Sequence, residues 1–235
     1  MSTDVSPWAR YWKDQTIFDD AILARNTRVF VRASERIMTY SAADRVLDVG
    51  CGSGDLIGTL APRVREVCGL DTSRRYVESC RERFKAFENV TIEQIGARYT
   101  DFSMLGDREF DKIVCLSVIQ YYREKDDLRS LIREVQRIAA PGARFLIGDI
   151  LSGTSLVQDI SSLLRSAVRD GEPIEVFRFL WRVRFSEYGK LRREIGLLSF
   201  SQDELLDMAN DLEVKAEIID GLTVNRNRSN LLICF

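Results

Sequence analysis

The chain has 235 residues, of which 45% are hydrophobic and 30% charged, as in a globular protein of about one domain. Its 34 basic and 36 acidic residues leave a net charge of −2, which provides no general attraction to nucleic acid or to anionic membranes. Histidine is absent, so histidine-dependent triads and imidazole metal ligands are excluded.

The cysteines argue against a disulfide framework or a structural zinc site. They are five in number, scattered, and form no CxxC pair, so we expect no metal. A reducing cytoplasm is the natural setting for such thiols. Residues 1–15 lack the apolar segment of a signal peptide, and no stretch has the apolar length of a membrane span.

The first 40 residues are predicted to form two helices, because apolar side chains recur at helical spacing over 17–24 and 29–37. The aromatic residues Trp8, Tyr11 and Trp12 come before them. One interpretation is a helix that packs on the sheet edge. The other is a lid over a ligand, in which Tyr11 would contact the ligand and an aromatic face would suit a cation.

Short apolar strands alternate with helical patterns along the rest of the chain. The strands are predicted over 45–50, 65–71, 89–96, 110–118 and 143–150. The helices between them are predicted over 55 to about 62, 72–87 and 125–140. A helix over 201–211 and strands over 213–220 and 229–235 complete the chain. This alternation predicts a parallel sheet covered by helices on both faces.

The stretch VLDVGCGSGDL, residues 46–56, places alternate glycines where a strand ends and a helix begins. Such a turn lets a ligand lie on bare backbone. The next strand ends in Asp71, whose carboxylate can accept both hydroxyls of a ribose. The glycine spacing and the acids Asp48 and Asp55 disfavour a pyrophosphate, and no Walker lysine is present. These residues suit a ligand that has a ribose and a positive charge but no phosphate, and S-adenosylmethionine is such a ligand.

Four segments resemble, in order, the motifs of class I S-adenosylmethionine-dependent methyltransferases. They are LDVGCGSGDL, VCGLDTS, FDKIVCLSVIQYY and IAAPGARFLIGDI, and the resemblance covers about residues 44–150. It implies a three-layer, doubly wound α/β fold with a mostly parallel seven-stranded sheet whose last strand is antiparallel. N-terminal helices and a helical cap before the last helix and two strands would complete the fold. The implied cofactor is S-adenosylmethionine.

The resemblance also implies which residues bind the cofactor. Those that would hold the methionine part are Asp48, Gly50, Cys51 and Gly52. Those near the ribose would be Asp71 and Thr72, and those near the adenine Ala97 and Arg98. Leu116 and Ser117 would meet the ligand after the fourth strand. Many family members carry an aspartate where this chain has Ala97, so here the backbone or a later residue such as Asp101 would read the adenine.

Methyl transfer to a hydroxyl also needs a group that takes a proton. The catalytic candidates at the carboxyl edge of the sheet are Tyr121, after the fourth strand, and Asp149, at the end of the fifth. Each has a plainer alternative: Tyr121 can be a pocket wall, and Asp149 can cap a loop or a helix.

The insertion over 151–199 contains RFLWRVRFSEYGKLRR, residues 178–193, which is predicted as a helix with six basic residues. In the functional interpretation Arg178, Trp181 and Arg182 bind an anionic acceptor. In the alternative, the aromatic side chains face inward and the arginines face water. Contact with a membrane surface is a weaker alternative, and no RNA-binding signature is present.

The sequence therefore predicts one methyltransferase domain over 1–235. Its parts are an N-terminal lid (1–40), a cofactor-binding core (41–150), a cap (151–199) and a C-terminal helix with two strands (200–235). The predicted function is S-adenosylmethionine-dependent methyl transfer to a hydroxyl, amine or carboxylate of a small acceptor. The alternative is a non-catalytic relative that binds a nucleoside or acts as a scaffold. An NAD-type oxidoreductase is disfavoured by the glycine spacing and Asp55.

Overall fold

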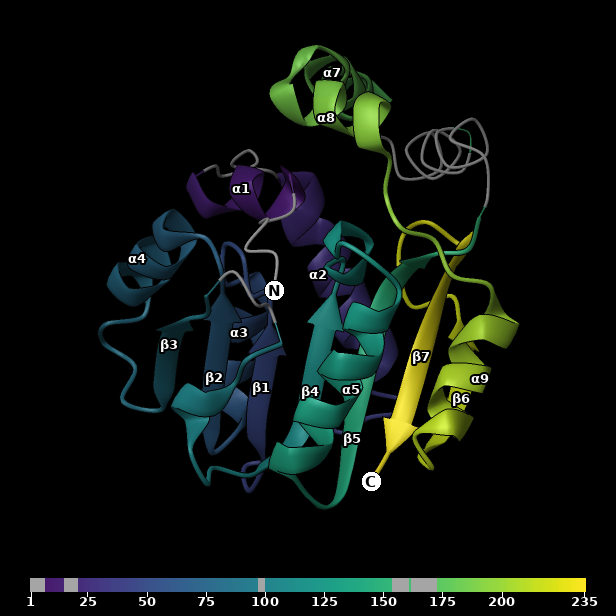
Figure 1. Ribbon diagram of the computed structural model, residues 1–235. Coiled ribbons are helices and arrows are strands. Elements are labelled where there is room, and N and C mark those ends of the chain that lie inside the picture. Colours follow the sequence, from purple (N-terminus) through teal and green to yellow (C-terminus); the bar gives the residue numbers. More distant parts are fainter. Residues whose placement is uncertain (1–6, 15–20, 97–99, 154–160, 162–172) are drawn as a thin grey trace.

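A single seven-stranded sheet runs through the molecule (Figure 1). The computed structural model describes residues 7–14, 21–96, 100–153, 161 and 173–235. Its strands are β1 (Arg45–Val49), β2 (Glu66–Asp71), β3 (Val90–Gln94), β4 (Phe110–Leu116), β5 (Ala139–Leu151), β6 (Lys215–Asp220) and β7 (Arg228–Cys234). They lie in the order β3-β2-β1-β4-β5-β7-β6. The first five are parallel and β7 is antiparallel to both neighbours, so the predicted fold class is confirmed.

Helices cover both faces of this sheet. The helices of the described residues are α1 (Pro7–Asp14), α2 (Ala21–Ser34), α3 (Asp55–Leu60), α4 (Arg74–Arg83), α5 (Asp126–Ile138), α7 (Pro173–Phe185), α8 (Glu187–Ile195) and α9 (Gln202–Asp211). Of these, α1, α7 and α8 lie beyond the carboxyl ends of the parallel strands, and the other helices pack on the faces (Figure 1). Helices α2, α3 and α4 contribute to one apolar core, and α5 and α9 to the other. In Figure 1, α5 lies in front of the sheet and α2 behind it. Among the described residues, no helix combines the length and apolar character needed to cross a membrane.

The junction between α5 and β5 differs from the prediction. The helix ends at Ile138, before the predicted residue 140, and β5 already begins at Ala139. Pro141 cannot continue a helix and keeps the residue before it extended. The pairing of β5 with β4 shifts register just beyond Ala139, so the Pro141-Gly142 pair lies within an irregular strand. The restriction that Pro141 places on the backbone therefore ends the helix two residues earlier than predicted.

Serine side chains set several helix starts. Ser73 precedes α4 and accepts the N–H of Tyr76, as one of the two predicted caps. The helix predicted over 178–193 is divided in two at Ser186, whose hydroxyl accepts the N–H of Gly189 and caps α8. A Cβ on Gly189 would overlap the carbonyl oxygen of Val183, so the tight corner requires glycine there. The helical prediction is confirmed, with a break that a polar cap explains.

The parallel strands point toward α1, α7 and α8 (Figure 1). Helix α1 is joined to α8 and to the short 3-10 helix η3 (Ile119–Tyr121) by what we call the aromatic cluster, which consists of Trp8, Tyr11, Trp12, Tyr121 and Tyr188. The indole N–H of Trp8 donates to the carbonyl of Gly196 at 3.0 Å. The cluster thus covers the carboxyl edge of the sheet, where ligands bind in open parallel sheets.

Candidate active site

A cavity of about 220 Å³ opens at the carboxyl ends of β1, β2 and β4, beneath the aromatic cluster. Its walls include seven residues that the sequence predicted: Gly50, Gly52, Asp71, Thr72, Leu116, Ser117 and Tyr121. Aromatic side chains also line it: Trp12, which belongs to the lid that the sequence suggested, and Tyr76 and Tyr188, which were not predicted for this site. The cavity is therefore built where the predicted motifs meet.

The glycine turn has a backbone that side chains disfavour. Gly50, Gly52 and Gly54 have φ angles of 77°, 50° and 78°. A Cβ on Gly54 would also lie 2.6 Å from the ring of Phe84, so close packing requires this glycine. On Gly52 a Cβ would meet no atom within 4 Å. The open space at Gly52 is where a ligand can lie against the backbone.

The N–H groups of the turn are already bonded within the protein. Those of Gly50 and Cys51 both donate to the carbonyl of Leu70, at 2.7 and 2.9 Å. That of Gly52 donates to Oδ2 of Asp71 at 2.8 Å. Phosphate-binding turns direct such donors at the ligand. The N–H groups of Gly50, Cys51 and Gly52 are therefore not directed at a ligand phosphate, which agrees with the predicted phosphate-free ligand.

Asp71 is held firmly at the end of β2. Its side chain accepts the N–H of Gly52 on Oδ2 and that of Ser73 on Oδ1, both at 2.8 Å. Burial raises the pKa of this carboxyl, while the hydrogen bonds from Ser73 and Gly52 lower it. Each oxygen of a carboxylate has a second lone pair, so Asp71 can still accept two hydroxyls from the cavity.

Asp48 lies buried in β1, just before the glycine turn. Among the described residues, its buried Oδ2 has no hydrogen-bond partner. Burial first, and then the charges of Asp71 and Asp55, raise its pKa to about 8. A buried carboxyl that lacks a partner suits a cationic ligand group. Unlike Gly52 and Asp71, however, Asp48 is not among the residues that line the cavity. Binding of an ammonium group by Asp48 therefore remains a prediction.

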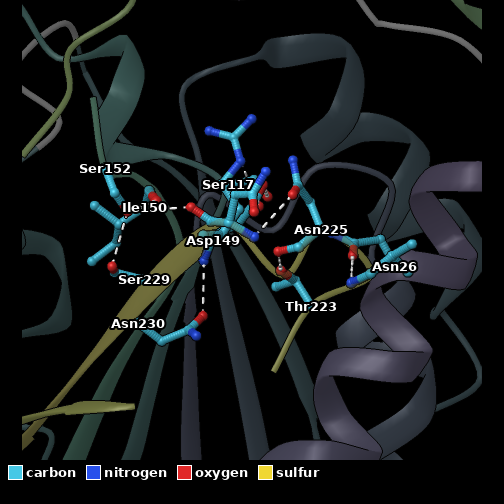
Figure 2. Close-up of polar contacts among 12 residues, drawn as sticks. Asn26, Ser117, Asp149, Ile150, Ser152, Thr223, Asn225, Ser229 and Asn230 are labelled. Atoms are coloured by element: carbon cyan, nitrogen blue, oxygen red, sulfur yellow. Dashed lines mark hydrogen bonds and ion pairs between the residues drawn. The ribbon is translucent and has the colours of Figure 1, made fainter. Parts of the chain in front are cut away.

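Two neighbouring strands end in strained residues that contact each other. Ser117 follows β4 with φ 60°, and Asp149 lies near the end of β5 with φ 62°. The hydroxyl of Ser117 donates to Oδ2 of Asp149 at 2.6 Å (Figure 2). Residues other than glycine rarely adopt this conformation, and such strain is concentrated at functional sites. Because Ser117 lines the cavity, the pair connects Asp149 to it.

Asp149 is oriented from its other side by β7. Nε of Arg228 lies 3.6 Å from its Oδ1, and both side chains are largely buried. The N–H of Asp149 donates to Oδ1 of the buried Asn230 at 3.1 Å (Figure 2). The pairing of β5 with β7 is irregular between Ile147 and Ile150, and such bulges redirect side chains. The bulge and these partners keep the Asp149 carboxylate toward Ser117.

Tyr121 lines the cavity as a neutral phenol. Its hydroxyl lies 3.1 Å from that of Tyr188. Burial and the neighbouring Tyr188 raise the pKa of Tyr121 well above its usual value of 10. It can therefore donate a hydrogen bond at neutral pH, but it does not supply an anionic base. That Tyr121 takes part in catalysis as a hydrogen-bond donor remains a prediction.

The helix predicted as a lid approaches the cavity through a different residue from the one expected. Tyr11 packs edge-to-face against Trp8 within the aromatic cluster, with 5.9 Å between the ring centroids, whereas Trp12 lines the cavity. Among the described residues, the buried Nε1 of Trp12 has no partner. Trp8 and Trp12 are one helical turn apart and share a face, so helical spacing could have identified Trp12.

Cys51 lies outside the cavity lining, and two other predicted site residues are not described. Ala97 and Arg98 are outside the described residues. Cys51 does not line the cavity, and a hydrogen bond with Cys80 together with burial raises the pKa of its thiol well above the usual value. It therefore remains a thiol, as expected for a residue that fills a tight turn.

The basic helix α7 does not enter this cavity. Arg178, Trp181 and Arg182 are all exposed and are absent from its lining. The expectation that the aromatic residues of this segment face inward is wrong for Phe177, Trp181 and Phe185, each more than 60% exposed. Among the aromatic residues of this segment whose side chains are described, it holds for Tyr188, which the break at Ser186 turns into the aromatic cluster. Substrate binding by these residues of α7 remains a prediction.

Comparisons with known proteins agree with this geometry. Residues 46–142 match the family model of the methyltransferase domain. Chondramide synthase cmdD of Chondromyces crocatus is 36% identical over 143 residues, which are 59% of this chain and 4% of the synthase. The 27-O-demethylrifamycin SV methyltransferase of Amycolatopsis mediterranei (strain S699) is 28% identical over 216 residues, 90% of this chain and 74% of that protein.

A solved structure shares the fold over almost the whole chain. The N-methyltransferase NodS from Bradyrhizobium japonicum WM9, in complex with S-adenosyl-L-homocysteine, has a TM-score of 0.57 at 16% identity. The likeness covers 97% of this chain and 95% of that one. Against two of its curated relatives, however, this chain spans about half of the relative's length or less.

Proposed function

Since residues 46–142 form a class I methyltransferase domain, as the motifs predicted, we propose that the chain transfers the methyl group of S-adenosylmethionine to a small acceptor. The reacting group of the acceptor would be a hydroxyl, an amine or a carboxylate. The observation that supports this best is the combination of the unpartnered Asp48 with Asp71 and the open backbone at Gly52. A scaffold would not need this arrangement.

The residues divide into binding roles by their chemistry. Asp71 accepts the two ribose hydroxyls on the lone pairs that its backbone partners leave available. Asp48 pairs with the ammonium group of the methionine part. Trp12 and Tyr188 cover the cavity and exclude water, and their aromatic faces suit a positively charged sulfur.

The chemical step needs alignment and a proton acceptor. Bound S-adenosylmethionine supplies a methyl group that its positive sulfur already activates. Ser117 donates its proton to Asp149, so the lone pairs of its oxygen remain for an acceptor O–H or N–H. As the acceptor attacks, its proton moves to Oγ of Ser117 and the proton of Ser117 moves to Asp149. Arg228 keeps the carboxylate of Asp149 oriented for this role.

A hydroxyl is the acceptor group that we favour. The relay through Ser117 is useful only where the acceptor must lose a proton, which applies to a hydroxyl or an amine more than to a carboxylate. One relative is named as a methyltransferase of 27-O-demethylrifamycin SV, a name that indicates transfer to an oxygen atom. Its match covers 90% of this chain. The cavity beneath the aromatic cluster favours a small molecule over an extended polymer.

Calorimetric titration tests the function directly. We expect S-adenosylmethionine and S-adenosylhomocysteine to bind with micromolar dissociation constants, and NAD to bind at least about 100-fold more weakly because the N–H groups of Gly50, Cys51 and Gly52 already bond within the protein. Equal binding of NAD would contradict the proposal. A panel of phenols, aliphatic alcohols and amines then separates the enzyme from the scaffold, since tight binding without any turnover would favour the scaffold.

Binding should also release a proton from Asp48. With a pKa of about 8, this carboxyl is mostly protonated at pH 7, and pairing with an ammonium group lowers its pKa. Titration of S-adenosylhomocysteine in buffers of different ionisation enthalpy should therefore show a net release of protons at pH 7. The Asp48→Asn variant should release almost none and bind more weakly. Equal proton release in both proteins would refute this role of Asp48.

The same shift has a consequence for the free protein. The folded state keeps a proton on Asp48 that the unfolded chain loses near its ordinary value of 3.8. The free energy of unfolding contributed by this group therefore falls as the pH rises from about 4 to about 8, and is constant above that range. Thermal melting across this range should show the decline in the native protein and a smaller decline in Asp48→Asn.

A further inference from the structure

A second cavity, of about 590 Å³, lies where β5 and β6 end and β7 begins. Three arginines line it, Arg36, Arg226 and Arg228, against one acid, Asp220. Uncharged hydrogen-bonding side chains, including Ser152 and Gln202, complete its walls. Guanidinium groups pair with carboxylates and phosphates through two parallel hydrogen bonds, so this composition favours an oxyanion.

Interactions within the protein hold several of these side chains in place. The side chain of Arg228 is only 13% exposed and is fixed by its ion pair with Asp149. Arg36 donates from Nη2 to the backbone carbonyl of Asp220 at 3.0 Å. The hydroxyls of Ser152 and Ser229 lie 2.9 Å apart (Figure 2). A site whose groups are already positioned loses little side-chain entropy on binding.

A continuous series of contacts links this second cavity to the cavity of the candidate active site. Ser117 lines the first cavity and hydrogen-bonds Asp149, Asp149 pairs with Arg228, and Arg228 lines the second. All of these residues lie at the carboxyl edge of the parallel strands. The arginines of α7 that the sequence favoured, Arg178 and Arg182, are exposed and line neither of these two cavities.

We propose that this arginine-lined cavity binds a carboxylate or phosphate group of the acceptor, so that the methylated group is directed toward Ser117. This inference rests on the proposed function, because it assumes a methyl acceptor. It names the substrate class as a small molecule with an oxyanion at one end and a hydroxyl or amine at the other. Arg226, which is exposed, and Arg36, whose guanidinium bonds the carbonyl of Asp220, would both donate hydrogen bonds to the anion.

Inorganic phosphate is the probe for a first test. It is titrated by calorimetry into the full chain saturated with S-adenosylhomocysteine, in the native protein and in the double variant Arg36→Gln, Arg226→Gln. Both side chains are exposed, so the variant is expected to fold, and melting curves check this. The double variant Arg178→Gln, Arg182→Gln removes the same charge from α7 and serves as the matched control.

We expect phosphate to bind the native protein and the control alike, and the cavity variant at least about 10-fold more weakly. Equal affinity in all three proteins, or no phosphate binding at all, would overturn the proposal. S-adenosylhomocysteine should bind all three equally. Failure of that nucleoside to bind any of them would refute the proposed function, and phosphate titration of the free protein would then still report on the anion cavity.

Kinetics distinguish an anion of the acceptor from a separate ligand. With an acceptor found in the panel, phosphate should inhibit competitively against the acceptor but not against S-adenosylmethionine. The cavity variant should raise KM for an acceptor that carries a carboxylate about 10-fold and leave kcat nearly unchanged. Phosphate that binds these arginines without competing with any acceptor would make the anion a separate ligand and would overturn the assignment to the acceptor.

Discussion

The Asp71→Ala protein is expected to bind S-adenosylhomocysteine at least about 100-fold more weakly than the native chain, because a site built to bond substrate hydroxyls loses this much when its acceptor is removed. The carboxylate is largely buried and is the acceptor at the end of β2 that lines the cavity. Calorimetric titration at constant pH measures the change. An affinity within a factor of three of the native value would show that Asp71 does not bind the ribose.

Two further variants separate a ligand contact from a structural one. Asp71 also accepts the N–H groups of Gly52 and Ser73, so its loss is expected to cost about 1–3 kcal/mol of folding free energy. Asp71→Asn keeps one acceptor oxygen and should show an intermediate affinity. Asp55→Asn is the control beside the same turn, because its carboxylate bonds Ser53 and Arg83. The control should bind almost as the native protein does.

Asp149→Asn is expected to slow methyl transfer to a hydroxyl acceptor by about 100-fold to 10,000-fold, the range typical of a general base. The amide is nearly the same size and can still accept the hydrogen bond of Ser117, but it cannot take up a proton. Binding of S-adenosylhomocysteine should change little, since Asp149 does not line the cofactor cavity. Single-turnover assays with a labelled methyl donor measure the step directly.

The pH profile distinguishes a base from a residue that only caps a loop. The native rate should fall at low pH as Asp149 is protonated, and this limb should be missing in Asp149→Asn. Asp207→Asn changes an exposed acid on α9 and provides the control. If Asp149→Asn keeps the native rate and the native pH profile, Asp149 is a structural residue of the bulge in β5.

Most of the fold could be predicted because its signals are local. The alternation of strands and helices, Ser73 as a cap and the positions of the glycines all depend on residues that are close in sequence. The two helices predicted over 17–24 and 29–37 are instead represented by one helix, α2, which continues through residues 25–28. The prediction also failed at Ile138 and Ser186, where a proline restriction and a serine cap compete with a continuous helical pattern. In both places the hydrophobic period alone extends the helix too far.

The partners of Asp149 depend on topology and could not be read from spacing. Ser117 and Asp149 are separated by 32 residues, and they meet because β4 and β5 are neighbours in the sheet. Arg228 reaches Asp149 because β7 returns antiparallel beside β5. The same return builds the arginine-lined cavity, whereas the basic run on α7, conspicuous in the sequence, remains at the surface.

The order of residues alone determined the strand-and-helix pattern, the glycine turn and the two acids that suit a cationic nucleoside, since each is a property of a short segment and of its side-chain chemistry. Only the tertiary structure decided that Ser117 connects Asp149 to the cavity, and that Arg36, Arg226 and Arg228 line a second cavity together. The reason is physical: a side chain's charge and shape are inherent in its type, but its neighbours depend on how distant strands pair and which faces the helices bury.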